Sequence, residues 1–169
     1  MQLITNILTR DATLDDLEAI TAIYNATIPT RMVTADTEPV TVESRKNWFG
    51  EHVPGKRPLW VMENDGVITG WLSFQSFYGR PAYDATAEVS IYIHHDYRKL
   101  GLGKQFLQLA IDRSPVLGIT TLLGFIFGHN TPSLQLFTQF GFEVWAHLPR
   151  IARLDGTERD LMIVGKRVG

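Results

Sequence analysis

The sequence predicts a single α/β domain over residues 1–169, with a mixed, mostly antiparallel sheet, a central parallel strand–helix–strand unit and helices on both faces. Tight turns at Asn64-Asp65-Gly66 and Asp155-Gly156 each separate two apolar segments, which is typical of antiparallel hairpins. Between these hairpins an alternating strand is followed by an amphipathic helix and a second strand, the order of a parallel unit. A chain of 169 residues fits one domain with one core.

The first half of the chain is expected to form two helices and three strands. Thr13 opens the first helix with Asp16 three residues later, the spacing of a capping box. Leu14, Leu17, Ile20 and Ile23 then recur at helical spacing. In chain order we expect a strand over Ile7–Arg10, this helix, a helix over Thr41–Phe49, and hairpin strands over Leu59–Glu63 and Val67–Phe77.

The second half contains the parallel unit and a final hairpin. A helix from near Lys104 to Arg113 is ended by Ser114-Pro115 and Gly118. A later helix carries Pro132 in its first turn, where proline is well tolerated. The expected elements are strands over Ala87–Ile93 and Thr120–Phe127, a helix over Thr131–Phe140, and hairpin strands over Glu143–Leu154 and Thr157–Lys166.

Composition narrows the possible functions. Lys and Arg number 16 against 18 Asp and Glu, giving a net charge of −2, so we expect neither nucleic acid nor an anionic membrane as a partner. The absence of cysteine excludes disulfides, thiolate metal sites and a cysteine nucleophile, and agrees with a cytoplasmic location. Residues Met1 to Asn6 show no basic start followed by an apolar run, and no long apolar run occurs, so neither secretion nor membrane spanning is expected.

A glycine-rich loop connects the central strand to the next helix. It reads Arg98-Lys99-Leu100-Gly101-Leu102-Gly103 and is followed by Lys104. Free N–H groups and the positive end of the dipole at a helix start favour a pyrophosphate, and glycines that can adopt positive φ let it approach. The dinucleotide fingerprint fails at Phe106, and the nucleoside-triphosphate loop fails at Arg98 and Gln105. The pattern that remains is an R-x-x-G-x-G turn, which we interpret as a phosphate-binding loop. The alternative interpretation is a glycine-rich strand-to-helix connection that binds no ligand.

In one known family, this loop occurs together with several other segments that are also present in this chain. They are Thr37-Glu38-Pro39, the run from Tyr83 to Ile93, and Asn130-Thr131-Pro132-Ser133 opening a helix that ends at Phe140-Gly141-Phe142. With these segments the chain resembles the phosphinothricin acetyltransferase family of the GNAT superfamily. The resemblance implies a GNAT fold, acetyl-CoA as donor, a small amine-bearing acceptor and a homodimer.

One face of the central strand is unexpectedly polar. Alternation places Ala87, Val89, Ile91 and Ile93 on one side, and Thr86, Glu88, Ser90 and Tyr92 on the other. Acetyl transfer needs a neutral amine, and burial raises a carboxylate pKa toward neutrality, so Glu88 is the candidate catalytic base. The alternative is a structural ion pair of Glu88 with Arg80 or Arg150.

The resemblance also suggests how the donor binds. The backbone of Ile91, Tyr92 and Ile93 would pair with the pantetheine amides, which requires the neighbouring strand to splay away, and the N–H near Ile93 would polarise the thioester. Asn130 and Ser133 would contact the pantetheine chain, although simple helix capping is the alternative. The pyrophosphate would be held by Arg98, Lys99, Leu100, Gly101, Leu102, Gly103 and Lys104.

The acceptor is expected between Pro81, Ala82 and Tyr83 and the segment from Thr34 to Pro39, which includes Thr37. Arg80 is the candidate for binding an anionic group of the acceptor, with Arg31 and Arg150 as alternatives. Many GNAT enzymes use a tyrosine to protonate the leaving thiolate. Phe137 stands in the corresponding position, and Tyr92 and Tyr83 are weaker substitutes.

The pair His94-His95 invites a metal interpretation. Adjacent side chains of an extended chain point to opposite sides, so we expect no shared metal ion there. The leading hypothesis is thus an acetyl-CoA-dependent N-acetyltransferase that acts by direct attack on the α-amino group of a small amino-acid analogue such as phosphinothricin or methionine sulfoximine. The alternatives are acetylation of a protein or peptide amine and a non-catalytic acyl-CoA sensor.

Overall fold

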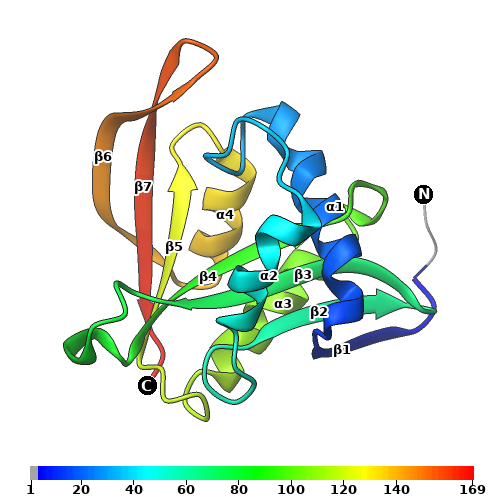
Figure 1. Ribbon diagram of the computed structural model, residues 1–169. Coiled ribbons are helices and arrows are strands. Elements are labelled where there is room, and N and C mark those ends of the chain that lie inside the picture. Colours follow the sequence, from blue (N-terminus) through cyan, green and yellow to red (C-terminus); the bar gives the residue numbers. More distant parts are fainter. Residues whose placement is uncertain (1–3) are drawn as a thin grey trace.

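The computed structural model describes residues 4–169 (Figure 1). The expectation that Met1 to Asn6 do not start a secretory leader therefore falls partly outside the described residues. The chain folds around a seven-stranded sheet with the strand order β1-β2-β3-β4-β5-β7-β6. Within the described part of the chain β4 and β5 are the one parallel pair, and the other neighbours are antiparallel. The strands are β1 (Ile7–Asp11), β2 (Leu59–Asn64), β3 (Val67–Ser76), β4 (Thr86–Ile93), β5 (Thr121–Phe127), β6 (Glu143–Leu154) and β7 (Thr157–Arg167). The predicted mixed sheet is confirmed.

Helices cover both faces of this sheet, as the sequence predicts (Figure 1). One core cluster packs Ile20 and Ile23 against Trp71 of β3. A larger cluster on the opposite face includes Phe106 and Phe137. The α-helices of the described residues are α1 (Leu17–Thr27), α2 (Val42–Gly50), α3 (Leu102–Arg113) and α4 (Thr131–Gln139), of which α1 lies on the first face and α3 and α4 on the second.

The start of the first helix differs in detail from the prediction. The Asp16 carboxylate accepts the Thr13 N–H at 2.7 Å, as a capping box requires, and is also bound by both terminal nitrogens of Arg10. However, residues Leu14–Asp16 form a 3₁₀ turn before α1 begins, and the Leu14 side chain is 56% exposed. Its assignment to the apolar face of the helix is therefore wrong, because the tighter 3₁₀ turn rotates it away from the core.

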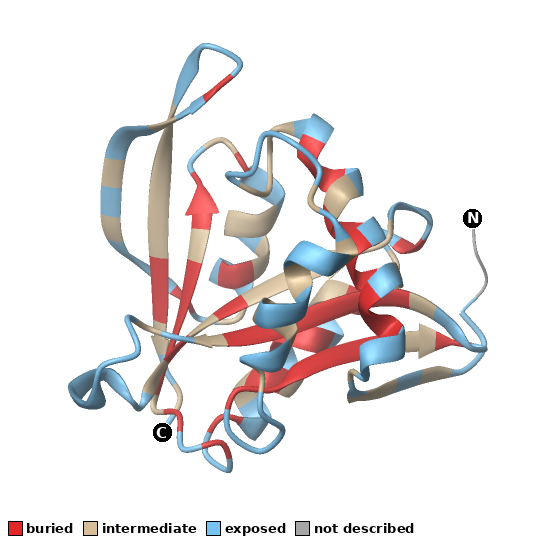
Figure 2. Cartoon of the chain, viewed as in Figure 1, coloured by how far each residue is buried: buried red, intermediate tan, exposed pale blue. Residues whose placement is uncertain are grey.

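Burial is concentrated in the middle of the sheet (Figure 2). β2, β3 and β5 are mostly buried, whereas the tip of the β6–β7 hairpin extends past the end of β5, and most side chains along β6 are exposed. Among residues 4–169, no helix combines the length and the apolar character needed to cross a bilayer.

Candidate active site

The parallel strands β4 and β5 separate halfway along β4. They pair from Thr86 to Glu88, and within the described residues β4 has no partner on that side beyond Glu88. The Phe77 N–H donates to the Thr86 carbonyl, and the His94 N–H donates to the Thr69 carbonyl. The backbone N–H and C=O groups of the even-numbered residues of β4 therefore point toward β3, and those of the odd-numbered residues point away from it. The N–H groups of Ile91 and Ile93 consequently point into the gap. The splay that the predicted donor site requires is present.

A cavity of about 460 Å³ opens on the polar face of β4. Its floor consists of three cross-strand pairs between β3 and β4, namely Gln75 with Glu88, Ser73 with Ser90 and Trp71 with Tyr92. The opposite face of β4 is apolar, since Ala87 and Val89 are buried in the core that contains α3. The predicted alternation along this strand is confirmed.

Glu88 lies where the two strands separate and is half-buried in the cavity floor. Within residues 4–169 no side chain forms an ion pair or hydrogen bond with its carboxylate. Burial without a cation raises the pKa of Glu88 to about 7. The alternative of a structural ion pair with Arg80 or Arg150 is therefore wrong, and the carboxylate is suited to accept a proton near neutral pH.

A loop after α1 and the β6–β7 hairpin cover this cavity. Val33, Thr34 and Ala35 line it, and the Tyr24 hydroxyl lies 2.5 Å from the Thr34 hydroxyl and also donates to Asp36. Burial and the Asp36 carboxylate raise the pKa of Tyr24 to about 12. The opposite wall is mostly apolar and consists of Phe125, Phe127, Ile151, Ala152 and Leu161.

Helix α2 contributes Arg45 and Trp48 to the cavity. The Arg45 guanidinium carbon lies 4.1 Å from the centroid of the Trp48 ring and 4.9 Å from that of Tyr24. Sequence reasoning missed these residues together with Ser73 and Gln75. Polar residues at alternate positions of the otherwise apolar β3 would have indicated the last two, and the i, i+3 spacing of Arg45 and Trp48 would have indicated one helix face.

The predicted phosphate loop presents a series of free amides. Within the described residues, none of the N–H groups from Lys99 to Lys104 donates to a protein acceptor, and the first α3 bond of this kind runs from Gln105 to the Gly101 carbonyl. Lys99 and Gly101 adopt φ of 63° and 84°. This turning backbone and the helix start form a nest of free N–H groups, a geometry that is suited to an anion.

Two details of the loop differ from expectation. The helix α3 begins at Leu102 rather than near Lys104, with Gly101 as its N-cap. Gly101 uses the left-handed region, but Gly103 does not, and a methyl group on Gly103 would meet only Leu136 at an ordinary 3.5 Å. The structure thus gives Gly103 no conformational reason to be glycine.

Asn130 caps helix α4, because its side-chain oxygen accepts the Ser133 N–H at 3.3 Å. The capping alternative is confirmed for this pair, and a contact with pantetheine stays a prediction. Phe137 is buried in the core, where its ring lies 4.9 Å from that of Phe142. A phenyl ring has no proton to donate, so Phe137 cannot protonate the thiolate. The ring of Tyr92, one of the suggested substitutes, stacks on that of Trp71 with centroids 4.4 Å apart.

Several residues expected around the acceptor lie away from the cavity lining. The turn Pro81–Tyr83 and the preceding Arg80 are exposed, and Thr37 is exposed as well. Of the predicted segment from Thr34 to Pro39, Thr34 and Ala35 line the cavity. A role of Arg80, Pro81, Ala82, Tyr83 and Thr37 in acceptor binding stays a prediction.

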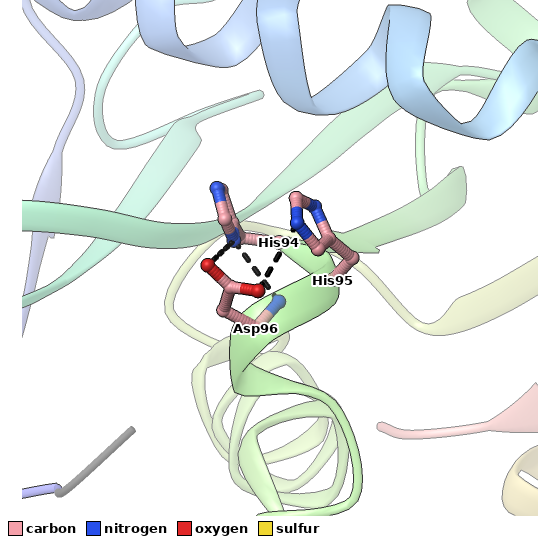
Figure 3. Close-up of side chains that lie close together, drawn as sticks. All are labelled: His94, His95 and Asp96. Carbon is pink, nitrogen blue, oxygen red and sulfur yellow. Dashed lines mark hydrogen bonds and ion pairs between the residues drawn. The ribbon is translucent and has the colours of Figure 1, made fainter. Parts of the chain in front are cut away.

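The reasoning about His94 and His95 is wrong in its geometry. A 3₁₀ turn begins at His95, so both rings lie on the same side and stack with centroids 4.4 Å apart (Figure 3). Potential ligand atoms of His94, His95 and Asp96 lie within 4.8 Å of one another. The His94 Nδ1 already accepts the Asp96 N–H at 3.1 Å. The expectation that no metal binds there stays a prediction, without the alternation argument.

Comparison with known proteins finds relatives that match most of the chain. A protein of Bacillus subtilis strain 168, named "Putative phosphinothricin acetyltransferase YwnH", is 54% identical over 154 residues, covering 90% of this chain and 94% of its own. An L-methionine sulfoximine/L-methionine sulfone acetyltransferase of Pseudomonas paraeruginosa is 30% identical over 153 residues, covering 90% of this chain and 89% of its own.

A solved structure has the same fold. The GNAT superfamily phosphinothricin acetyltransferase from Sinorhizobium meliloti, crystallised in complex with acetyl-CoA, superimposes with a TM-score of 0.91 at 25% identity, covering 98% of this chain and 90% of its own. Residues 19–142 of the chain match the acetyltransferase (GNAT) family. With its splayed parallel strands, its amide nest and its relatives, the chain belongs to the GNAT family of acetyltransferases.

Proposed function

We propose that the protein transfers the acetyl group of acetyl-CoA to the α-amino group of a small amino-acid analogue of the phosphinothricin, methionine sulfoximine or methionine sulfone type. The cavity on the polar face of β4 is the acceptor cavity in this proposal. The observation that carries the proposal is the unpaired Glu88 carboxylate, which is half-buried where this cavity meets the gap between β4 and β5. Relatives named for these acceptors support the substrate class.

The geometry supports direct attack. Glu88 takes a proton from the acceptor ammonium, and the neutral amine attacks the thioester carbonyl at the mouth of the gap. The N–H of Ile93 points into this gap and would stabilise the oxyanion of the tetrahedral intermediate. The amides of Lys99 to Lys104 hold the pyrophosphate, and Ile91 to Ile93 align the pantetheine arm.

As the thiolate leaves, the second proton of the attacking nitrogen passes to water, so release needs no side-chain acid in this scheme. Phe137 offers no proton, and a thiol with a pKa of about 8.5 leaves acceptably as thiolate. The resemblance to the family further supports a homodimer, which light scattering tests: a mass of 19.1 kDa in dilute solution would contradict it.

The decisive experiment measures release of free CoA from acetyl-CoA with a panel of amines. The expected result is turnover with amino-acid sulfones, sulfoximines or phosphinates, together with heat of binding when CoA is titrated into the protein. Turnover only with peptide N-termini or lysines on a peptide array would favour protein acetylation instead. Binding of CoA without turnover of any amine would indicate a sensor.

A further inference from the structure

The acceptor cavity contains one side chain of each formal charge. Among the residues that line it, Arg45 is the cation and Glu88 is the carboxylate. Tyr24 and Tyr92 also line it, and burial raises the pKa of both phenols, so they remain uncharged at neutral pH. The rest of the lining is neutral. A ligand that carries one amine and one anion matches this pair of charges.

The Arg45 guanidinium is positioned without an acidic partner. Its carbon lies over the rings of Trp48 and Tyr24, at 4.1 Å and 4.9 Å from their centroids, so cation–π contacts hold it beside these two rings. Within residues 4–169 it forms no ion pair and no hydrogen bond. Because its N–H donors have no acceptor among the described residues, they are available to a ligand.

The other candidate arginines are differently placed. Arg31 binds Asp155 at 2.9 Å and donates to the Thr37 carbonyl, and the Arg150 Nε lies 3.9 Å from Glu158. Neither lines the cavity, and Arg80 lies in the exposed loop before the Pro81–Tyr83 turn. An anion that shares the cavity with Glu88 therefore meets Arg45 rather than these groups.

Resting on the proposed function, we propose that Arg45 binds the carboxylate of the acceptor while the acceptor amine lies at Glu88. The guanidinium fork takes a carboxylate through two parallel hydrogen bonds. The half-buried position of Arg45 makes each bond stronger than at an open surface. This contact selects free amino acids over simple amines and over amino acids whose carboxylate is masked.

The test compares L-methionine sulfone with its carboxamide, since the sulfone head is neutral and the carboxylate is the only anion of the first compound. We expect the unmodified enzyme to prefer the acid in kcat/KM. Arg45→Gln should lower kcat/KM for the acid by about a hundredfold, with less than about a threefold change for the carboxamide. Arg45→Lys keeps the charge but loses the planar fork, so its kcat/KM for the acid should lie between the values of the unmodified enzyme and Arg45→Gln.

Lys46→Gln is the matched control on the same helix. Lys46 is exposed, pairs with Glu43 at 2.5 Å and does not line the cavity, so this variant should keep the preference for the acid. Retained turnover of the carboxamide by Arg45→Gln shows that this variant is folded. If Arg45→Gln does not fold, the ratio of the two substrates in Arg45→Lys decides.

The outcomes separate this proposal from the proposed function. Equal losses on both substrates in the Arg45 variants, or no preference in the unmodified enzyme, would overturn the role of Arg45 and leave acetyl transfer intact. Failure of the unmodified enzyme to acetylate either compound or any other amino-acid analogue would overturn both.

Discussion

At the scale of single residues, the proposed chemistry depends on an isolated carboxylate. Glu88 has no cation beside it, and burial raises its pKa to about 7. A general base must be deprotonated, so kcat of the unmodified enzyme should rise with pH through about 7 and then level off. Glu88→Gln should lower kcat by about a hundredfold or more and abolish this rise, with donor affinity kept. Measuring kcat from pH 5.5 to 9 with saturating substrates checks both effects.

The control for this prediction is Glu143→Gln at the exposed start of β6, which should leave the profile unchanged. Any rise caused by the acceptor amine itself persists in both variants, because it belongs to the substrate. A Glu88→Gln enzyme with full activity and an unchanged profile would show that another group takes the proton.

Residue roles were predictable where a local pattern carries them. Alternation along one strand is enough to place Glu88, Ser90 and Tyr92 on a polar face. The partners that complete the cavity come from a neighbouring strand, from α2 and from the distant β6–β7 hairpin. No local spacing shows that Arg45 lies above the same floor as Glu88, since that neighbourhood depends on packing of the whole α1–α2 segment over the sheet.

At the scale of elements, both hairpins and the parallel unit were predictable, because turn residues and apolar periods mark them. Strand order was not, since β7 pairs with β5 and places β6 at the sheet edge. Element bounds differ from the predicted ones where a single backbone conformation sets them. Gly101, with a φ of 84°, is the N-cap of α3, which therefore begins two residues before the predicted start near Lys104.

The two glycines of the phosphate loop should respond differently to alanine. Gly103 lies inside the first turn of α3 with an ordinary φ, and an added methyl group would make only an ordinary 3.5 Å contact with Leu136. Gly103→Ala should therefore raise the free energy of unfolding by about 0.5 to 1 kcal/mol through helix propensity. The same methyl group would crowd a pyrophosphate bound at the loop as proposed, and should therefore weaken CoA binding. Calorimetric titration and thermal unfolding measure the two effects.

Gly101→Ala is the comparison for that variant. Its methyl group would meet no atom within 4 Å, but its φ of 84° is strained for alanine, so this variant should lose both stability and CoA affinity. Unchanged CoA affinity in Gly103→Ala would show that the ligand does not approach the loop as closely as proposed.

At the scale of the whole molecule, the carboxylate that we propose as the catalytic base should reduce stability. The pKa of Glu88 is about 7 in the folded chain and 4.5 is its ordinary value, so between these pH values the folded state binds more protons than the unfolded state. The free energy of unfolding must then fall as pH rises through this window, by at most about 3 kcal/mol.

Glu88→Gln removes this proton linkage, because an amide does not titrate. In urea unfolding the variant should be more stable than the unmodified chain at pH 8, by up to about 3 kcal/mol. This advantage should shrink toward zero as pH falls below about 4.5, where the carboxyl is protonated in both states. An advantage that does not change with pH would mean that the gain comes from packing rather than from relief of a buried charge.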